Sequence, residues 1–127
     1  MNQLHQLLAQ SAATHPVQTA VVDPEREVSA SYEQLQKLAV IMEARLRDAG
    51  VGSGDRVGIC MPKSIGSLCG VFGALRAGAA YVPVDSTAPP ERNAFIFSDC
   101  AVRAIVVAEK LADGLIAEFG DGRLSNT

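Results

Sequence analysis

The chain has 127 residues, enough for one compact domain and too few to accommodate a second easily. Nearly half of the residues (48%) are apolar, which excludes disorder as the default state. The charge is mixed and mildly acidic, with 11 Lys and Arg against 14 Asp and Glu, a net of -3. Because no basic run or basic–aromatic alternation occurs, we expect no nucleic-acid partner.

The sequence also argues against export and membrane insertion. The first residues lack a basic region followed by an apolar core, so no secretory signal is visible. The uncharged run 65–75 is too short to span a bilayer, and Arg76 would lie inside the membrane if the run were extended. We therefore expect a buried helix there, no membrane span and a cytoplasmic protein. The odd number of cysteines, without metal or redox spacing, is typical of reduced thiols: Cys60, Cys69 and Cys100.

The first third of the chain predicts a helix and a β-hairpin. A helix ending near residues 14–16 carries an apolar face made of Leu4, Leu7, Leu8 and Ala12. Residues 17–22 form an apolar strand, and residues 27–31 alternate polar with small or apolar side chains. The turn between them is predicted at Asp23-Pro24-Glu25-Arg26.

The next helix has the clearest periodicity in the sequence. Ser31 is placed to cap its N-terminus, with Gln34 completing a capping box. Arg45 and Arg47 lie in the last turns, where the helix dipole favours cations, and Gly50 supplies a left-handed cap. The predicted buried stripe consists of Tyr32, Leu35, Leu38, Ala39, Met42, Leu46 and Ala49.

From residue 56 onward, strands and helices alternate. Apolar runs near 56–61, 80–84 and 103–107 predict strands, and helices are expected at about 65–77, 90–100 and 109–119, with Pro90 in a first helical position. Because each crossover contains a helix, the strands should be parallel. The predicted fold class is α/β: an incomplete three-layer unit with a short parallel β-α-β-α-β sheet, preceded by an N-terminal helix and β-hairpin. Its open sheet edges indicate a single partial domain over 1–127, with a polar tail at about 121–127.

Three places invite a ligand-binding interpretation. The glycines of Gly50-x-Gly52-x-Gly54 lie between a helix and a strand, the reverse of the order in phosphate loops, so a flexible connection is favoured. Lys63 and Ser64 follow a core strand, where open α/β sheets bind ligands; an ordinary surface lysine and N-cap are favoured over an anion site. Asp85 follows the next strand without a second acid, so a loop-capping role is favoured over a metal or phosphoacceptor site.

The remaining candidates for chemistry have simpler interpretations. His5 and His15 lack acids or cysteines at ligand spacing and are expected on the solvated surface. Tyr32 and Tyr81 are expected to pack with their hydroxyls reaching a partner or water. The aromatic pair Phe95 and Phe97 is expected to serve the core or a contact between subdomains. No residue is assigned to catalysis, cofactor binding or metal binding.

Three stretches resemble signatures of the AMP-forming adenylation superfamily, which includes acyl-CoA synthetases, nonribosomal peptide synthetase adenylation domains and luciferases. Residues 75–85, LRAGAAYVPVD, resemble its second signature, with Arg76 where Lys is common and Val84 where Ile is common. Residues 31–35, SYEQL, are similar to the first signature, with the acid displaced by one position. Residues 90–107 resemble the segment that follows the second signature.

The resemblance implies a role in a larger enzyme. Members of the family are several times longer and activate a carboxylic acid with Mg-ATP, forming an acyl-adenylate and pyrophosphate before transferring the acyl group to a thiol such as CoA or a carrier protein. Their Ser/Thr/Gly-rich phosphate loop closed by a Lys has no counterpart in residues 108–127. We therefore expect an inactive, structural N-terminal part of an acid-activating ligase, with the remainder of the adenylation domain as its partner. The alternative is a non-catalytic α/β interaction module that pairs with another chain through its open sheet edge.

Overall fold

The computed structural model describes residues 4–23 and 28–119. Five helices and five strands follow one another in the predicted order: α1 (Leu4–Thr14), β1 (Thr19–Asp23), β2 (Val28–Ser31), α2 (Tyr32–Asp48), β3 (Arg56–Cys60), α3 (Ile65–Arg76), β4 (Ala80–Pro83), α4 (Pro90–Asp99), β5 (Ala104–Val107) and α5 (Glu109–Glu118). The antiparallel pairing of β1 with β2 confirms the hairpin. Of the predicted turn 23–26, Asp23 ends β1 and residues 24–26 lie outside the described part of the chain.

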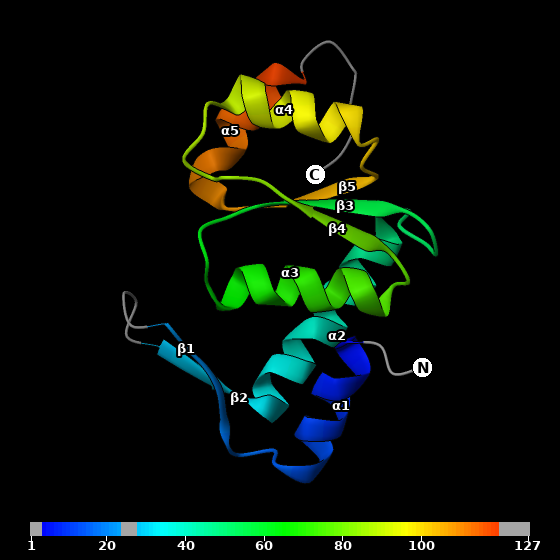
Figure 1. Ribbon diagram of the computed structural model, residues 1–127, viewed down its shortest axis with the longest axis vertical. Helices are drawn as coiled ribbons and strands as arrows, with labels where there is room; N and C mark the ends of the chain where they lie inside the picture. The colour runs from blue at the N-terminus through cyan, green and yellow to red at the C-terminus, as the bar shows by residue number, and fades with distance from the viewer. Residues whose placement is uncertain (1–3, 24–27, 120–127) are drawn as a thin grey trace.

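The core sheet has three parallel strands in the order β4-β3-β5, as the alternation predicts. Helices α4 and α5 cover one face of this sheet and α2 and α3 the other, while α1 and the hairpin lie beyond α2 and α3 (Figure 1). Side chains of a strand alternate between the two faces. Val57 and Ile59 therefore pack toward α2 and α3, and Gly58 and Cys60 face α4 and α5.

Each pair of layers has its own apolar cluster. The cluster between the sheet and α2 and α3 is built mainly of small and branched residues: Leu46, Val51, Val57, Ile59, Ala74, Ala77, Ala79 and Ala104. The cluster on the opposite face includes two aromatic rings and consists of Cys60, Ala94, Phe97, Val102, Ile105, Leu115 and Phe119. A third joins α1 to α2 and α3 through Leu8, Leu35, Ala39 and Cys69. The sheet is thus buried on both faces along its central strand.

Two helices begin with capping boxes. In α2 the Gln34 N–H donates to Ser31 Oγ (3.2 Å) and the Ser31 N–H donates to Gln34 Oε1 (2.8 Å), which confirms the predicted cap. In α3 the same exchange occurs between Ser64 and Ser67, at 3.0 and 3.1 Å. Both boxes satisfy backbone donors that the first turn of a helix leaves without partners.

The three helices that lead into the core strands all end in the same way. The residues Gly50, Gly78 and Ala101 have φ of 93°, 81° and 53°, in the left-handed region. In each case the N–H of the following residue donates back to a carbonyl of the last helical turn, as Val51 does to Leu46. This is the Schellman arrangement, in which glycine is the usual left-handed residue. Ala101 adopts it without glycine, so its cap was not predictable from composition.

Some predicted boundaries and burial assignments are wrong. Val17 precedes β1 and is 85% exposed, because pairing with β2 begins only at Thr19. On the predicted apolar faces, Leu7 (48% exposed) and Leu38 (41%) lie at the edges of their stripes, where no described element covers them fully. No helix within residues 4–23 and 28–119 has the length and apolarity needed to cross a bilayer. The cysteines are free thiols: Cys60 and Cys69 are buried and Cys100 is half-buried.

Candidate functional site

The carboxyl ends of the parallel strands form one edge of the sheet, where open α/β sheets usually bind ligands. A hollow of about 650 Å³ lies beside the ends of β3 and β5, lined by Met61, Pro62, Ala108, Glu109, Lys110 and Asp113. The segment after β4, beginning at Val84, reaches the same edge because the Val84 N–H donates to Ile59 O of β3 (3.0 Å). This edge is the candidate functional site.

Ser64 and Lys63 occupy the loop between β3 and α3 at this edge. The Ser64 hydroxyl accepts the Ser67 N–H, and Ser67 Oγ accepts the Ser64 N–H while donating to Ser64 O (2.9 Å). Lys63 is exposed. The predicted N-cap role of Ser64 is therefore confirmed, and its hydroxyl is engaged within the loop.

Asp85 follows β4 and closes a local turn. Its Oδ1 accepts the Thr87 N–H (2.9 Å) and the Thr87 hydroxyl (2.6 Å). These two hydrogen bonds lower the pKa of the Asp85 carboxyl below its ordinary value, and the Arg92 charge adds to the effect. The loop-capping role predicted for Asp85 is confirmed.

Asn93, which sequence reasoning missed, is the buried polar residue of this edge. It is 1% exposed, and its Nδ2 donates to Asp85 O (3.0 Å) and approaches Cys60 Sγ (3.8 Å). Its Oδ1 is buried without a hydrogen-bond partner. The helical period could have predicted its burial, because Asn93 lies on the same face of α4 as the buried residues Ala94 and Phe97. Asn93 thus ties α4 to the ends of β3 and β4.

The glycine-rich connection lies at the opposite, amino edge of the sheet. Gly52 N–H donates to Asp55 Oδ2 (2.8 Å), and Gly54 N–H donates to Gly78 O (3.0 Å), in the connection that leads into β4. Its backbone donors therefore hold two helix-to-strand connections together. The predicted helix-to-strand connection between α2 and β3 is confirmed, and its flexibility stays a prediction.

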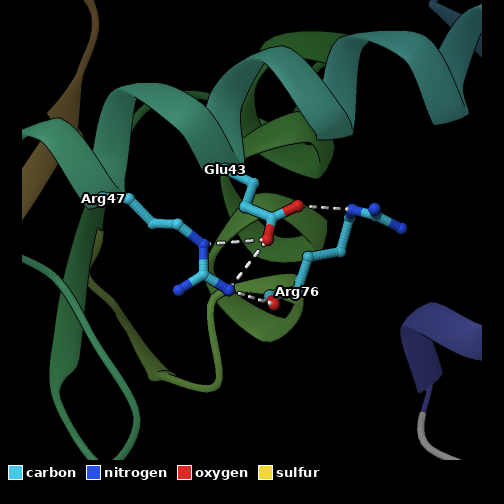
Figure 2. Close-up of polar contacts among 3 residues, drawn as sticks. All are labelled: Glu43, Arg47 and Arg76. Atoms are coloured by element: carbon cyan, nitrogen blue, oxygen red, sulfur yellow. Dashed lines mark hydrogen bonds and ion pairs between the residues drawn. The ribbon is translucent and has the colours of Figure 1, made fainter.

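A second polar cluster, also missed, joins α2 to the end of α3 (Figure 2). Glu43 accepts from Arg47 Nε (3.0 Å) and Arg76 Nε (2.9 Å), and Arg47 Nη2 donates to Arg76 O (3.2 Å). Burial pushes the pKa of the Glu43 carboxyl upward, but the hydrogen bonds and charges of the two arginines outweigh it and hold the pKa below the ordinary value. The Glu43–Arg47 pair is readable from its spacing, whereas Arg76 lies far from Glu43 in the sequence.

The other aromatic and histidine candidates separate clearly. Phe97 is fully buried, as expected of a core residue, while Phe95 is 63% exposed. His15 is exposed as predicted, but His5 is half-buried with its Nδ1 lacking a partner, because α1 packs on α2 and α3. Tyr32 is half-buried and Tyr81 is 39% exposed. Within the described ranges no group of three His, Cys, Asp or Glu side chains is arranged to hold a metal ion.

This fold and its signatures match a known family along almost the whole chain. The sequence model of the family described as AMP-binding enzyme matches residues 8–125. The chain belongs to this family. Its second signature contributes the end of α3, the Gly78 cap, β4 and the Asp85 turn, so residues 75–85 form one folded connection.

Similar proteins include two bacterial synthases and one solved N-terminal domain. Syringomycin synthase SyrB1 of Pseudomonas syringae pv. syringae is 40% identical over 103 residues, covering 81% of this chain and 16% of that protein. Bacitracin synthase 1 of Bacillus licheniformis is 36% identical over 115 residues, covering 91% of this chain and 2% of that protein. The crystal structure of the N-terminal domain of FACL13 from Mycobacterium tuberculosis has a TM-score of 0.86 and 28% identity, over 99% of this chain and 33% of that one. The chain therefore spans a small share of its relatives and corresponds to an N-terminal part of this superfamily of ligases.

Proposed function

We propose that this chain is the architectural N-terminal part of an ATP-dependent ligase that activates a carboxylic acid and passes it to a thiol. In this proposal the sheet and helices form the body on which the nucleotide-binding remainder of an adenylation domain packs. Mg-ATP, the acid, and CoA or a carrier-protein thiol belong to that larger assembly.

The observation that carries the proposal is the state of the polar groups at the carboxyl edge. Ser64 is occupied in a capping box, Asp85 in a turn with Thr87, and Asn93 in holding Asp85 O. Groups engaged in internal hydrogen bonds stabilise the edge but leave few donors to bind phosphates. In this proposal the hollow beside Met61 and Ala108 is a surface on which the remainder of the adenylation domain packs.

The first experiment measures acid-dependent ATP–pyrophosphate exchange and ATP binding by the purified 127-residue chain. We expect no exchange and no stoichiometric ATP binding. Turnover by this chain alone would contradict the proposal, because the chemistry would then reside in residues assigned here to structure.

The second experiment tests the scaffold role directly. In a chimera, residues 8–125 of this chain replace the matching segment of SyrB1. The rate of acid-dependent ATP–pyrophosphate exchange by the chimera is compared with that of unmodified SyrB1, using the acid on which SyrB1 acts. We expect the chimera to keep activity, because the transplanted residues carry the fold and not the chemistry. A matched chimera with Val57→Asp, which places a charge in the fully buried core, is expected to lose it. A folded but inactive first chimera would overturn the proposal.

The second candidate function is an interaction module that pairs with another chain through its sheet edge. The observation in its favour is that β4 and β5 each pair only with β3 among the described strands. This second candidate predicts that the isolated chain binds a partner protein and that the SyrB1 chimera lacks exchange activity.

We further propose the cytoplasm as the place of action. Burial raises the pKa of the Cys60 and Cys69 thiols, which keeps them protonated and unreactive, and Cys100 is also free. Three free thiols suit a reducing compartment. Growth of cells expressing a fluorescent fusion, followed by fractionation, tests this assignment.

A further inference from the structure

Strand β4 is an edge strand of the core sheet among the described strands, and the backbone groups of alternate residues point away from β3. The Ala80 N–H donates to Asp55 O (2.9 Å) and the Val84 N–H donates to Ile59 O (3.0 Å), so positions 80 and 84 face β3. Backbone groups of successive residues in a strand point alternately to its two sides. The groups of Tyr81 and Pro83 therefore point away from β3, toward the side on which no described strand lies.

Proline at position 83 removes one of the two donors of this edge. Pro has no N–H, and its ring occupies the space through which a partner's carbonyl would approach. Because position 83 faces outward, this loss takes no hydrogen bond from the internal ladder with β3. Within β4 the free edge offers the Tyr81 N–H as a donor, beside the carbonyls of Tyr81 and Pro83.

The segment around Pro83 is one that would otherwise be prone to add a strand. Residues 79–84, AAYVPV, are uncharged and apolar, and Ala80, Tyr81 and Pro83 are exposed. Exposed edges of this composition are templates for pairing with identical copies. A twofold arrangement would place β4 antiparallel to β4 of a second copy, with Val82 at the centre and each Tyr81 opposite position 83 of the other chain.

We infer that Pro83 blocks the β4 edge against strand addition by a second copy of this chain. In a regular antiparallel pair, Tyr81 and the residue opposite it would exchange two hydrogen bonds. With Pro83 opposite, each such pair can form only the bond donated by Tyr81. The device is independent of the proposed ligase role, and it directs any pairing of this chain through its sheet toward β5.

The test compares the self-association of the wild type, Pro83→Val and Pro83→Ala by sedimentation velocity over a concentration series. Restoring the donor at position 83 adds a hydrogen bond to each of the two symmetric pairs. We expect both variants to associate at concentrations about tenfold or more below the wild type. The control is Pro90→Val, which removes an exposed proline at the first position of α4, and it should behave as the wild type.

Two further readouts separate edge pairing from nonspecific aggregation. Tyr81→Lys in the Pro83→Val background places a charge on the edge and should return association to the wild-type level. Hydrogen exchange should show a fast Tyr81 amide in the wild type and a slowed one in associated Pro83→Val. Equal association of the Pro83 variants and the wild type, or an equal increase in Pro90→Val, would overturn the inference.

Discussion

Phe97 fills the space that a side chain at Gly58 would occupy. A Cβ built on Gly58 would lie 2.5 Å from Phe97 Cε1, closer than real Cβ contacts, and the Phe97 side chain is fully buried against the sheet. Because Gly58 has no side chain, the Phe97 ring packs directly against the middle of β3, in the cluster between the sheet and α4 and α5. The close approach of Phe97 to the sheet therefore requires a residue without a side chain at position 58.

Replacing Gly58 with Ala should therefore destabilise the fold. We expect the free energy of unfolding to fall by about 1–3 kcal/mol, since the ring cannot move within a packed core without strain. The measurement is urea unfolding followed by circular dichroism. Gly52→Ala is the control, because its Cβ would meet only Asp55 Oδ2 at 3.9 Å, and it should change stability by less than about 1 kcal/mol. Equal effects at the two sites would contradict the packing argument.

The end of α4 offers a change in the opposite direction. Ala101 holds a left-handed conformation that costs a non-glycine residue roughly 1–2 kcal/mol. Ala101→Gly should relieve this strain. Part of the gain is offset because glycine loses more conformational entropy on folding, so we expect a net stabilisation of about 0.5–1 kcal/mol. The control is Ala117→Gly at an exposed position within α5, which should destabilise by about 1 kcal/mol. Thermal and urea unfolding would reveal whether the two signs differ as expected.

The Glu43 cluster predicts a pH-dependent contribution to stability. The pKa of Glu43 is lowered in the folded chain, so its contribution is present above the unfolded value, about 4.5, and is lost as the pH falls through the folded value. Glu43→Gln should cost about 1 kcal/mol near neutral pH and progressively less below pH ~4.5. The Glu33–Lys37 pair is more exposed, so Glu33→Gln should have a smaller effect. Urea midpoints measured from neutral to acid pH test this, and a constant difference across that range would argue against it.

Position 93 should tolerate substitution by an apolar residue better than by a charged one. Asn93→Asp removes the donor to Asp85 O and buries a carboxylate without a cation, so we expect a loss of about 3 kcal/mol or more at neutral pH. Burial raises the pKa of such a carboxyl, so stability should recover as the pH falls and the group takes up a proton. Asn93→Leu leaves Asp85 O without this donor but also removes the unpaired Oδ1; its cost should be smaller and independent of pH. Unfolding experiments at neutral and acid pH on both variants distinguish the two cases.

Local signals account for the parts of the fold that sequence reasoning predicted. Helix α2 is marked by its period and by Ser31 and Gln34, and the apolar runs place β3, β4 and β5 to within a residue or two. The glycines Gly50 and Gly78 mark two of the three helix ends. The cap at Ala101 carries no such mark, because its conformation is imposed by the connection between α4 and β5.

The missed residues of the candidate site depend on contacts between distant segments. Asn93 is buried because α4 lies over the ends of β3 and β4. Its neighbours Glu91 and Arg92 are charged and exposed, so the local sequence predicts a solvated segment. Arg76 meets Glu43 only once α2 and α3 cross. Burial of Leu7 and Leu38 was overestimated because a helical stripe predicts a face and not how much of it a neighbour covers.

The strand order has a consequence for synthesis on the ribosome. β3 lies at the centre of the sheet, yet both of its neighbours come later in the chain, with β4 starting at residue 80 and β5 at residue 104. At typical elongation rates the segment from residue 56 to residue 104 takes roughly 2–10 s to appear. For that interval the central strand has at least one bare edge in the nascent polypeptide. During this window the nascent chain exposes a strand edge that the finished sheet pairs.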